Sequence, residues 1–229
     1  MNIETIFEKI LLQSGQFLLN TNRIEVDPDR FRHLVEDALA IYSKHHPYAE
    51  HVFVDFSASR VISLTDDVMC NLTGKTYLGT PDWISDVMPV RLYGINPFYV
   101  FKNLDPNWNN NLQEKAQMPF QYRKPKLYVS VSAEWDIHAV WKHRVIETQT
   151  EQEGYLYEVP TISVDDVIFF RLLKGMFLQS IGRSRRAFTI NDLPIAMDAA
   201  EIASEGQEIL DKAMEDIENH QKFYLAWGG

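Results

Sequence analysis

Residues 163–186 read SVDDVIFFRLLKGMFLQSIGRSRR, and this stretch decides the fold of the C-terminal third of the chain. Its apolar side chains recur at helical spacing, so we expect a helix that opens at Ser163 and ends at Gly182. Lys174 within this helix and three arginines after its expected end form a basic cluster. The arginines are Arg183, Arg185 and Arg186.

A second long helix is expected within residues 191–218. It carries nine carboxylates against one lysine. The small residues Ala199 and Ala203 would allow another helix to approach it closely. Two helices of opposite charge, followed by an aromatic tail with Tyr224 and Trp227, suggest surfaces that need a partner. The carboxylates of this helix include Glu201, Glu205 and Glu208.

Two further helices are expected near the N-terminus. The first spans residues 3–19, although Gly15 weakens it by about 1 kcal/mol relative to alanine. The second begins at Pro28, directly after the N-cap Asp27, and ends before Pro47.

The middle of the chain shows strand patterns around a long irregular loop at 65–125. This loop contains six prolines and many aromatic residues. We therefore expect an ordered or partner-ordered insertion, with short strands near 89–93 and 98–101. After the loop, alternating residues predict a hairpin that turns at Ala133 and Glu134. The expected strands are 51–56, 61–64, 126–132, 136–145 and 155–157, the last after a polar turn at 149–154.

The order of these elements predicts an α+β fold. It consists of two N-terminal helices, a small antiparallel β region with a long irregular insertion, and a C-terminal pair of long helices. We expect a single domain over residues 1–229. Its parts are the helices at 1–48, the β region at 49–162, and the helix pair with its tail at 163–229.

The composition argues against several classes of protein. An apolar content of 45% with 24% charged residues is typical of a globular chain. A net charge of −10 argues against binding nucleic acid with the whole surface. The single cysteine, Cys70, excludes an intrachain disulfide and favours a reducing compartment. No apolar run reaches the length of a membrane span, and the N-terminus lacks the pattern of a signal peptide.

The sequence offers little sign of a catalytic or metal site. Motifs for nucleotide binding, serine hydrolases and zinc proteases are absent. We therefore expect no catalytic residues, no metal and no other cofactor. The densest histidine group has no carboxylate or cysteine at ligand spacing. It consists of His33, His45, His46 and His51.

An enzyme is nevertheless an alternative. Its pocket would lie in the loop at 65–125 and would gather Asp66 and Asp67 with His51 or His138. His138 and His143 would face opposite sides of one predicted strand, so they would not act together.

The basic cluster has three competing interpretations: contact with DNA phosphate, pairing with the acidic helix of a neighbouring subunit, or solvation on a plain surface. The acidity of the chain favours the last two. The acidic helix has two interpretations, packing on its own domain and packing around a ring. Both can hold at the same time.

This arrangement resembles the neck proteins of tailed phages, the head-completion or head-to-tail connector proteins that dock beneath the portal. The resemblance covers residues 1–64 and 126–229 and leaves the loop without a counterpart. It lies in the order of the elements and in their local character. The segments that carry it are 38–46 (ALAIYSKHH), 126–131 (KLYVSV), 180–186 (SIGRSRR), the acidic helix and the ending Trp227-Gly228-Gly229.

The resemblance implies a structural virion protein that is located in the neck and assembled in the cytoplasm of the bacterial host. It implies a ring of about twelve subunits that joins portal to tail and continues the DNA channel. The implied partners are other copies, the portal protein and the next neck or tail-terminator protein. Packaged DNA would pass without sequence-specific contact, and no membrane is involved. Subunit or portal contacts are expected at Arg183, Arg185, Arg186, Ala199, Ala203, Glu201, Glu208, Tyr224 and Trp227.

Two alternatives to a neck ring stay open besides the enzyme. A tail-terminator or baseplate component would have similar features, because the sequence does not separate positions within a virion. A monomeric partner-binding module would form one folded species at all concentrations.

Overall fold

The fold is seen in a computed structural model that describes residues 1–15, 28–55, 59–92, 120–130, 133–150, 154–187 and 195–220. It is an α+β fold with antiparallel sheets. The chain divides into two compact units, which we describe separately. The helical unit comprises the described residues of Met1–Pro47 and Lys142–Phe223, and the β unit comprises those of Tyr48–Trp141. The sequence analysis treated these parts as one domain.

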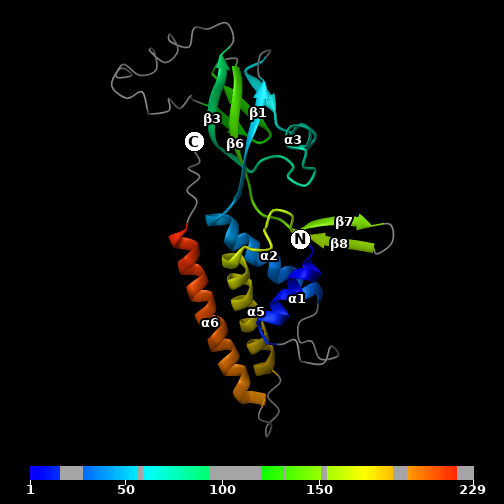
Figure 1. The fold of residues 1–229 in the computed structure, drawn as a ribbon, viewed down its shortest axis with the longest axis vertical. Helices are drawn as coiled ribbons and strands as arrows, with labels where there is room; N and C mark the ends of the chain where they lie inside the picture. Colours follow the sequence, from blue (N-terminus) through cyan, green and yellow to red (C-terminus); the bar gives the residue numbers. More distant parts are fainter. Residues whose placement is uncertain are drawn as a thin grey trace. The chain divides into compact units, whose positions relative to one another are not determined.

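Two long helices, α5 (Val167–Ala187) and α6 (Ile195–Asn219), form an antiparallel hairpin in the helical unit (Figure 1). Glycines set their separation. A Cβ atom added at Gly182 would lie 2.8 Å from the Cβ of Ala203, and one added at Gly206 would lie 2.8 Å from the backbone nitrogen of Gln179. Because no side chain fits at these positions, the glycines allow the two helices to pack closely.

The sequence analysis placed both ends of the first of these helices incorrectly. α5 does not end at Gly182 but continues to Ala187. Gly182 faces α6 inside the helix, so it serves packing rather than termination. The expected start at Ser163 is also too early. The side chain of Asp166 accepts a hydrogen bond from the backbone nitrogen of Phe169, at 3.0 Å, and caps the helix that follows.

The N-terminal helices α1 (Ile3–Gln13) and α2 (Pro28–His45) pack against the hairpin (Figure 1). The predicted start of α2 is confirmed. α1 is shorter than the predicted 3–19, because Gly15 takes a left-handed backbone conformation with φ of +67° just after its end. Residues 16–19 and Asp27 lie outside the described residues. The shared core includes Ile6, Phe31, Leu39, Phe169, Phe177 and Ile217.

A small hairpin of β7 (Ile146–Thr150) and β8 (Gly154–Glu158) also belongs to the helical unit. β8 confirms the strand expected at 155–157, whereas β7 was not predicted and includes residues 149 and 150 of the expected polar turn. An isolated bridge between Asn2 and Glu158 joins this hairpin to the start of α1.

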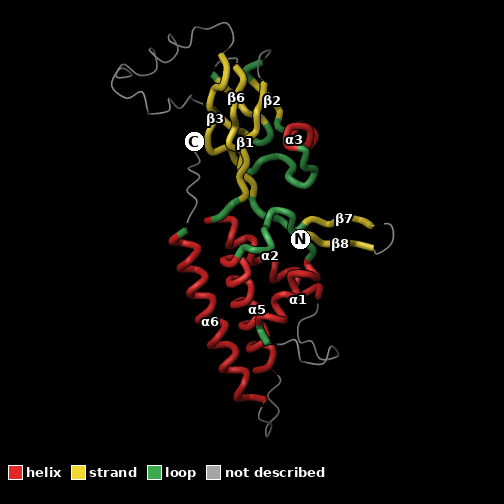
Figure 2. The backbone as a smooth tube through the Cα atoms, in the orientation of Figure 1, coloured by secondary structure: helices red, strands yellow, loops and turns green. Residues whose placement is uncertain are grey.

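The β unit contains two three-stranded antiparallel sheets (Figure 2). The first has the order β1 (Tyr48–Asp55), β6 (Ala133–Trp141), β3 (Trp83–Leu92). The second has the order β2 (Val61–Ser63), β5 (Lys126–Val129), β4 (Phe120–Arg123). Their inner faces share one apolar core, in which alternate residues of each strand point inward. This core includes Val52, Ile84, Val87, Leu127, Trp135 and Ile137.

Two predictions for this region are wrong. Ala133 and Glu134 do not form a turn between paired strands, because they begin β6, and β5 and β6 lie in different sheets. The loop at 65–125 is not irregular throughout, since it contains α3 (Asp66–Thr73), β3 and β4. Register shifts at Ser85 and Val90 interrupt the alternation of β3 and obscure it in the sequence. The strand expected at 89–93 overlaps β3, and the one at 98–101 lies outside the described residues.

Candidate functional site on the helical unit

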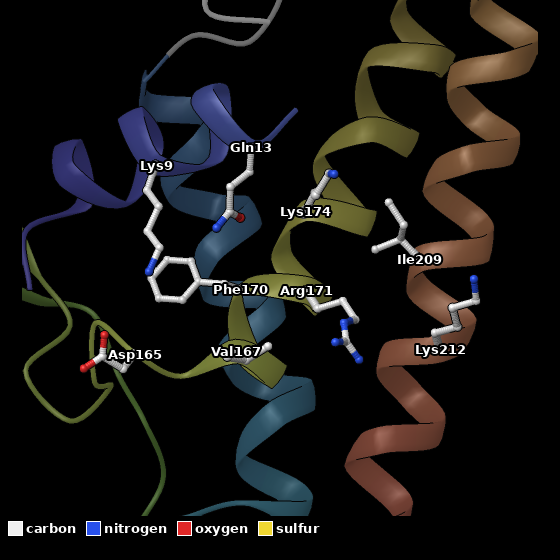
Figure 3. Close-up of a pocket in the computed structure, with 9 residues that line it drawn as sticks. All are labelled: Lys9, Gln13, Asp165, Val167, Phe170, Arg171, Lys174, Ile209 and Lys212. Carbon is white, nitrogen blue, oxygen red and sulfur yellow. The ribbon is translucent and has the colours of Figure 1, made fainter. Parts of the chain in front are cut away.

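A groove on the helical unit is lined by four cationic side chains, and we call it the basic groove (Figure 3). Lys9 comes from α1, Arg171 and Lys174 from α5, and Lys212 from α6. The groove has a volume of about 690 Å³. Four cations against the single carboxylate of Asp165 give the groove a positive lining in a chain whose net charge is −10, so the groove is a candidate for binding an acidic partner.

The four cations of the basic groove are engaged to different degrees. The Lys9 ammonium donates to the carbonyl oxygen of Val164 and lies 3.7 Å from the centroid of the Phe170 ring. Arg171 forms an ion pair with Asp216 of α6. In contrast, neither Lys174 nor Lys212 has a hydrogen bond or ion pair with any described residue. These two ammonium groups are therefore available to a ligand.

The basic groove also has apolar walls. Val167 is 64% exposed, Phe170 is buried, and Ile209 is half-buried on the α6 side (Figure 3). Asp165 is the one carboxylate among the lining residues. It precedes α5 and lies at a distance from Lys174 and Lys212 (Figure 3). Exposed apolar surface between cations suits an amphipathic segment whose acidic and apolar groups alternate.

A second charged surface lies on α6, and we call Glu201, Glu205 and Glu208 the acidic stripe. These residues recur at intervals of four and three, so they lie along one side of the helix. All three are exposed, and within the described chain none has a hydrogen bond or an ion pair. Arg185 of α5 borders the same shallow hollow as the acidic stripe.

The structure separates the predicted basic cluster. Lys174 lines the basic groove, whereas Arg185 lies beside the acidic stripe. Arg183 is exposed and has a long hydrogen bond of 3.5 Å to Gln179. Because α5 extends past Gly182, all three arginines belong to its last turns, where the helix dipole favours positive charge. The side chain of Arg186 lies outside the described residues.

The predicted contact residues Ala199 and Ala203 serve packing within the chain. Ala199 is completely buried, and Ala203 meets α5 at Gly182. The close approach that these small residues allow is thus made to α5 of the same molecule. Glu201 and Glu208 are exposed, as a contact surface requires. Tyr224 and Trp227 lie outside the described residues.

Lys9, Arg171 and Lys212 were not predicted from the sequence to belong to one site. They are far apart in the chain, and the groove exists because α1, α5 and α6 pack together. Lys212 carried the one available signal, since it is the lone lysine of an acidic helix.

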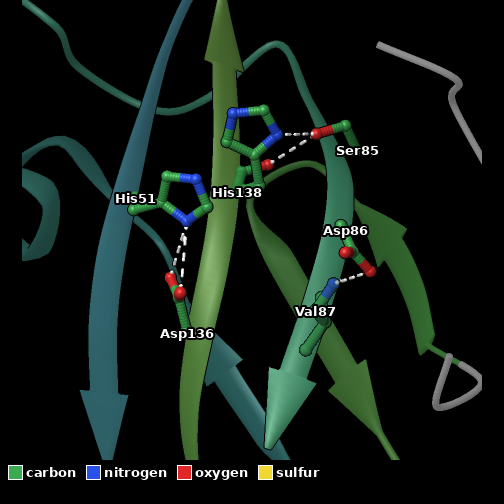
Figure 4. A network of polar contacts seen from close by, with 6 residues as sticks. All are labelled: His51, Ser85, Asp86, Val87, Asp136 and His138. Atoms are coloured by element: carbon green, nitrogen blue, oxygen red, sulfur yellow. Dashed lines mark hydrogen bonds and ion pairs between the residues drawn. The ribbon is translucent and has the colours of Figure 1, made fainter. Parts of the chain in front are cut away.

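Of the residues considered for an enzyme, His51 and His138 do meet, on neighbouring strands of the β unit (Figure 4). Their rings stack with centroids 4.6 Å apart. Nδ1 of His138 shares a hydrogen bond with the hydroxyl of Ser85. Asp136 accepts from His51, at 3.0 Å, rather than from His138. Asp136 therefore does not orient the histidine that contacts the serine, as a catalytic triad would require.

Burial and the neighbouring His51 lower the pKa of His138 below its ordinary value. The Ser85 hydroxyl also donates to the carbonyl oxygen of His138, at 3.2 Å. Ser85 is buried at a register shift in β3, between Ile84 and Asp86. The Ser85 contacts therefore stabilise an irregular strand pair.

Asp66 and Asp67, the acidic pair of the enzyme alternative, lie in the first turn of α3. Asp66 accepts hydrogen bonds from the backbone nitrogen and the hydroxyl of Thr80, both at 2.7 Å. Asp67 is exposed on α3. Across the described ranges, no three histidine, cysteine or acidic residues are placed to hold a metal ion.

The remaining histidines have separate surroundings. His33 contacts Glu36 on the surface, whereas His46 is buried, stacks on Tyr42 and contacts the carbonyl oxygen of Ile217. His143 is not on the strand of His138, because β6 ends at Trp141. Its Nε2 donates to the carbonyl oxygen of His46, at 2.8 Å.

No protein-family model and no curated protein matches the chain. Among the described helices, none is long and apolar enough to cross a membrane.

Proposed function

We propose that the protein is a structural subunit of a ring in the neck of a tailed phage, where it connects the portal to the tail and continues the DNA channel. The observation that supports this proposal best is the acidic stripe of α6, which is exposed and has no ion pair within the described chain. The carboxylates on one side of a rigid helix and the cations of the basic groove offer the complementary charges that an interface between subunits can use.

The proposed ring contains about twelve subunits, as the resemblance to neck proteins implies. It is built from a heterologous interface, in which two different surfaces of the same chain meet and the rotation between subunits closes. The net charge of −10 suits a channel wall that repels DNA and allows it to slide without sequence-specific contact.

The mass of the purified protein, measured by mass photometry with and without a portal ring, tests this proposal. We expect a closed oligomer of about twelve copies, alone or once the portal is present. A monomer at every concentration that also ignores the portal would contradict it. A tail-terminator or baseplate component remains the alternative, and cross-linking in assembled particles separates the two. Cross-links to the portal support the neck, and cross-links to the tail tube alone support the alternative.

A further inference from the structure

We infer that the basic groove of one subunit receives the acidic stripe of α6 from a second copy, in a head-to-tail contact that repeats from subunit to subunit. This inference rests on the proposed assembly and names the two surfaces that form its interface. The occupant of the groove is thus another molecule of the same chain.

Charge complementarity is the first argument. Lys174 and Lys212 have no hydrogen-bond or ion-pair partner in the described chain, and neither do the three carboxylates of the acidic stripe. Covering either surface with an apolar or like-charged partner would leave these charges desolvated and unpaired, which is costly. Bringing the two surfaces together can give each of the two ammonium groups a carboxylate partner.

The position of α6 gives the second argument. Ile209 and Lys212 of α6 form one side of the basic groove (Figure 3). On the same helix, Ile209 directly follows Glu208 of the acidic stripe and Lys212 comes about one turn after it. A rigid helix cannot be both the wall and the occupant of one groove. The acidic stripe therefore reaches a basic groove only in another molecule. Because the two surfaces differ, the contact is heterologous and produces a closed ring or an open chain.

The form of the basic groove gives the third argument. α1 and α6 stand on either side of α5, so the groove can accept a helix along α5. Lys174 on α5 and Lys212 on α6 both line this groove (Figure 3). The aliphatic stems of the incoming glutamates can cover the apolar side chains of Val167 and Ile209.

Zero-length carbodiimide cross-linking, which joins an amine to a carboxylate in direct contact, tests the inference on the wild-type chain at low salt. Unlabelled and isotope-labelled protein are mixed so that links between molecules can be recognised. We expect mixed-isotope links from Lys174 or Lys212 to the acidic stripe. Oligomers whose links between molecules avoid both surfaces would overturn the inference, and so would a protein that remains monomeric.

Two complementary variants provide a sharper test by mass photometry. The groove variant is Lys174→Ala with Lys212→Ala, and the stripe variant carries glutamine at all three positions of the acidic stripe. We expect each alone to self-associate at least about tenfold more weakly than wild type. Mixed in equal amounts, they should form a dimer and stop there, because the groove variant still presents an acidic stripe and the stripe variant still presents a basic groove.

Matched controls change the same charges elsewhere on the surface. The first is Lys44→Ala with Lys126→Ala, and the second is Glu4→Gln, Asp67→Asn and Glu147→Gln; all five residues are exposed. Both controls should assemble like wild type, and circular dichroism should show that every variant is folded. The inference fails if the mixed variants do not dimerise. It also fails if the groove variant self-associates like wild type and instead loses binding to the portal or to duplex DNA.

The outcomes separate this inference from the proposed ring. A closed ring whose cross-links run through other surfaces removes the inference and leaves the proposed function standing. Dimers or open chains that form through the basic groove and the acidic stripe without closing retain the inference and contradict the ring.

Discussion

Two lysines of the β unit form ion pairs within the chain, whereas two clustered sets of charges in the helical unit do not. In the β unit, Lys75 donates to Glu50 at 2.7 Å and to the hydroxyl of Tyr48, and Lys124 pairs with Asp82. In the helical unit, the acidic stripe and two lysines of the basic groove lack such partners among the described residues. Exposed charges without a described partner also occur in the β unit, at Asp67 and Lys126. The helical unit differs because its unpaired charges gather on two surfaces, and we propose that these surfaces bind a partner.

The largest expected effect concerns the core of the β unit. Trp135→Ala should destabilise this unit by about 3–5 kcal/mol, because Trp135 is completely buried between the sheets. Near-ultraviolet circular dichroism during denaturant unfolding measures the loss. Phe53→Ala removes another aromatic side chain, one that is 67% exposed on the same sheet, and should cost far less. Equal losses would show that the core is not where the structure places it.

The next effect concerns the close contact between α5 and α6. Gly206→Ala should destabilise the helical unit by roughly 1–3 kcal/mol, because the added Cβ would meet backbone atoms of α5. Alanine's higher helix propensity offsets at most about 1 kcal/mol of this loss. Far-ultraviolet circular dichroism during unfolding reports it, and Ser204→Ala at an exposed position is the control. A stabilised variant would mean that the hairpin is packed less tightly.

A smaller effect tests the comparison of charges directly. Lys75→Met should lower the free energy of unfolding by up to about 1 kcal/mol, because the ammonium of Lys75 is paired and its pKa is raised, chiefly by its hydrogen bond to Glu50. Lys212→Met in the basic groove should leave the free energy of unfolding nearly unchanged. The free energy of unfolding of both variants is measured at two salt concentrations. A larger loss for Lys212→Met than for Lys75→Met would contradict the contrast between the units.

The smallest effect is a dependence on pH. Burial, followed by the charge of His51, lowers the pKa of His138 in the folded state, so the unfolded chain binds a proton more readily. The stabilising contribution is fully present above the ordinary pKa of 6.5. It is lost as pH falls from there toward the folded pKa. Wild type should therefore lose more stability than His138→Gln on acidification, as measured by thermal unfolding. If the stability of wild type and of His138→Gln fell in parallel with pH, the pH dependence would not come from His138.

Local signals in the sequence predicted several elements correctly. The start of α2 follows from Pro28, and β8 follows from the strand pattern at 155–157, whereas β7 was not predicted. Gly182 shows where such reasoning fails. Glycine after an apolar run is a common helix end, yet here α5 continues because the missing side chain makes room for Ala203 of α6.

The candidate site was predictable in part. The exposed carboxylates Glu201 and Glu208 were recognised from the sequence, since charge on one side of a helix is a local property. The basic groove was not recognised, because Lys9 and Lys212 come together through packing between α1, α5 and α6. Ala199 and Ala203 were identified as sites of close helix contact, but the sequence did not reveal that the contacting helix is α5.

The sequence by itself determined the α+β class, the long helices and the opposite charges on them, because periodicity, capping and composition act over short stretches of chain. Tertiary structure alone decided that helices from both ends of the chain form one unit, that β5 and β6 lie in different sheets, and that cations from three helices share a groove. These features depend on contacts between distant residues, whose free energies come from burial and from the meeting of specific surfaces.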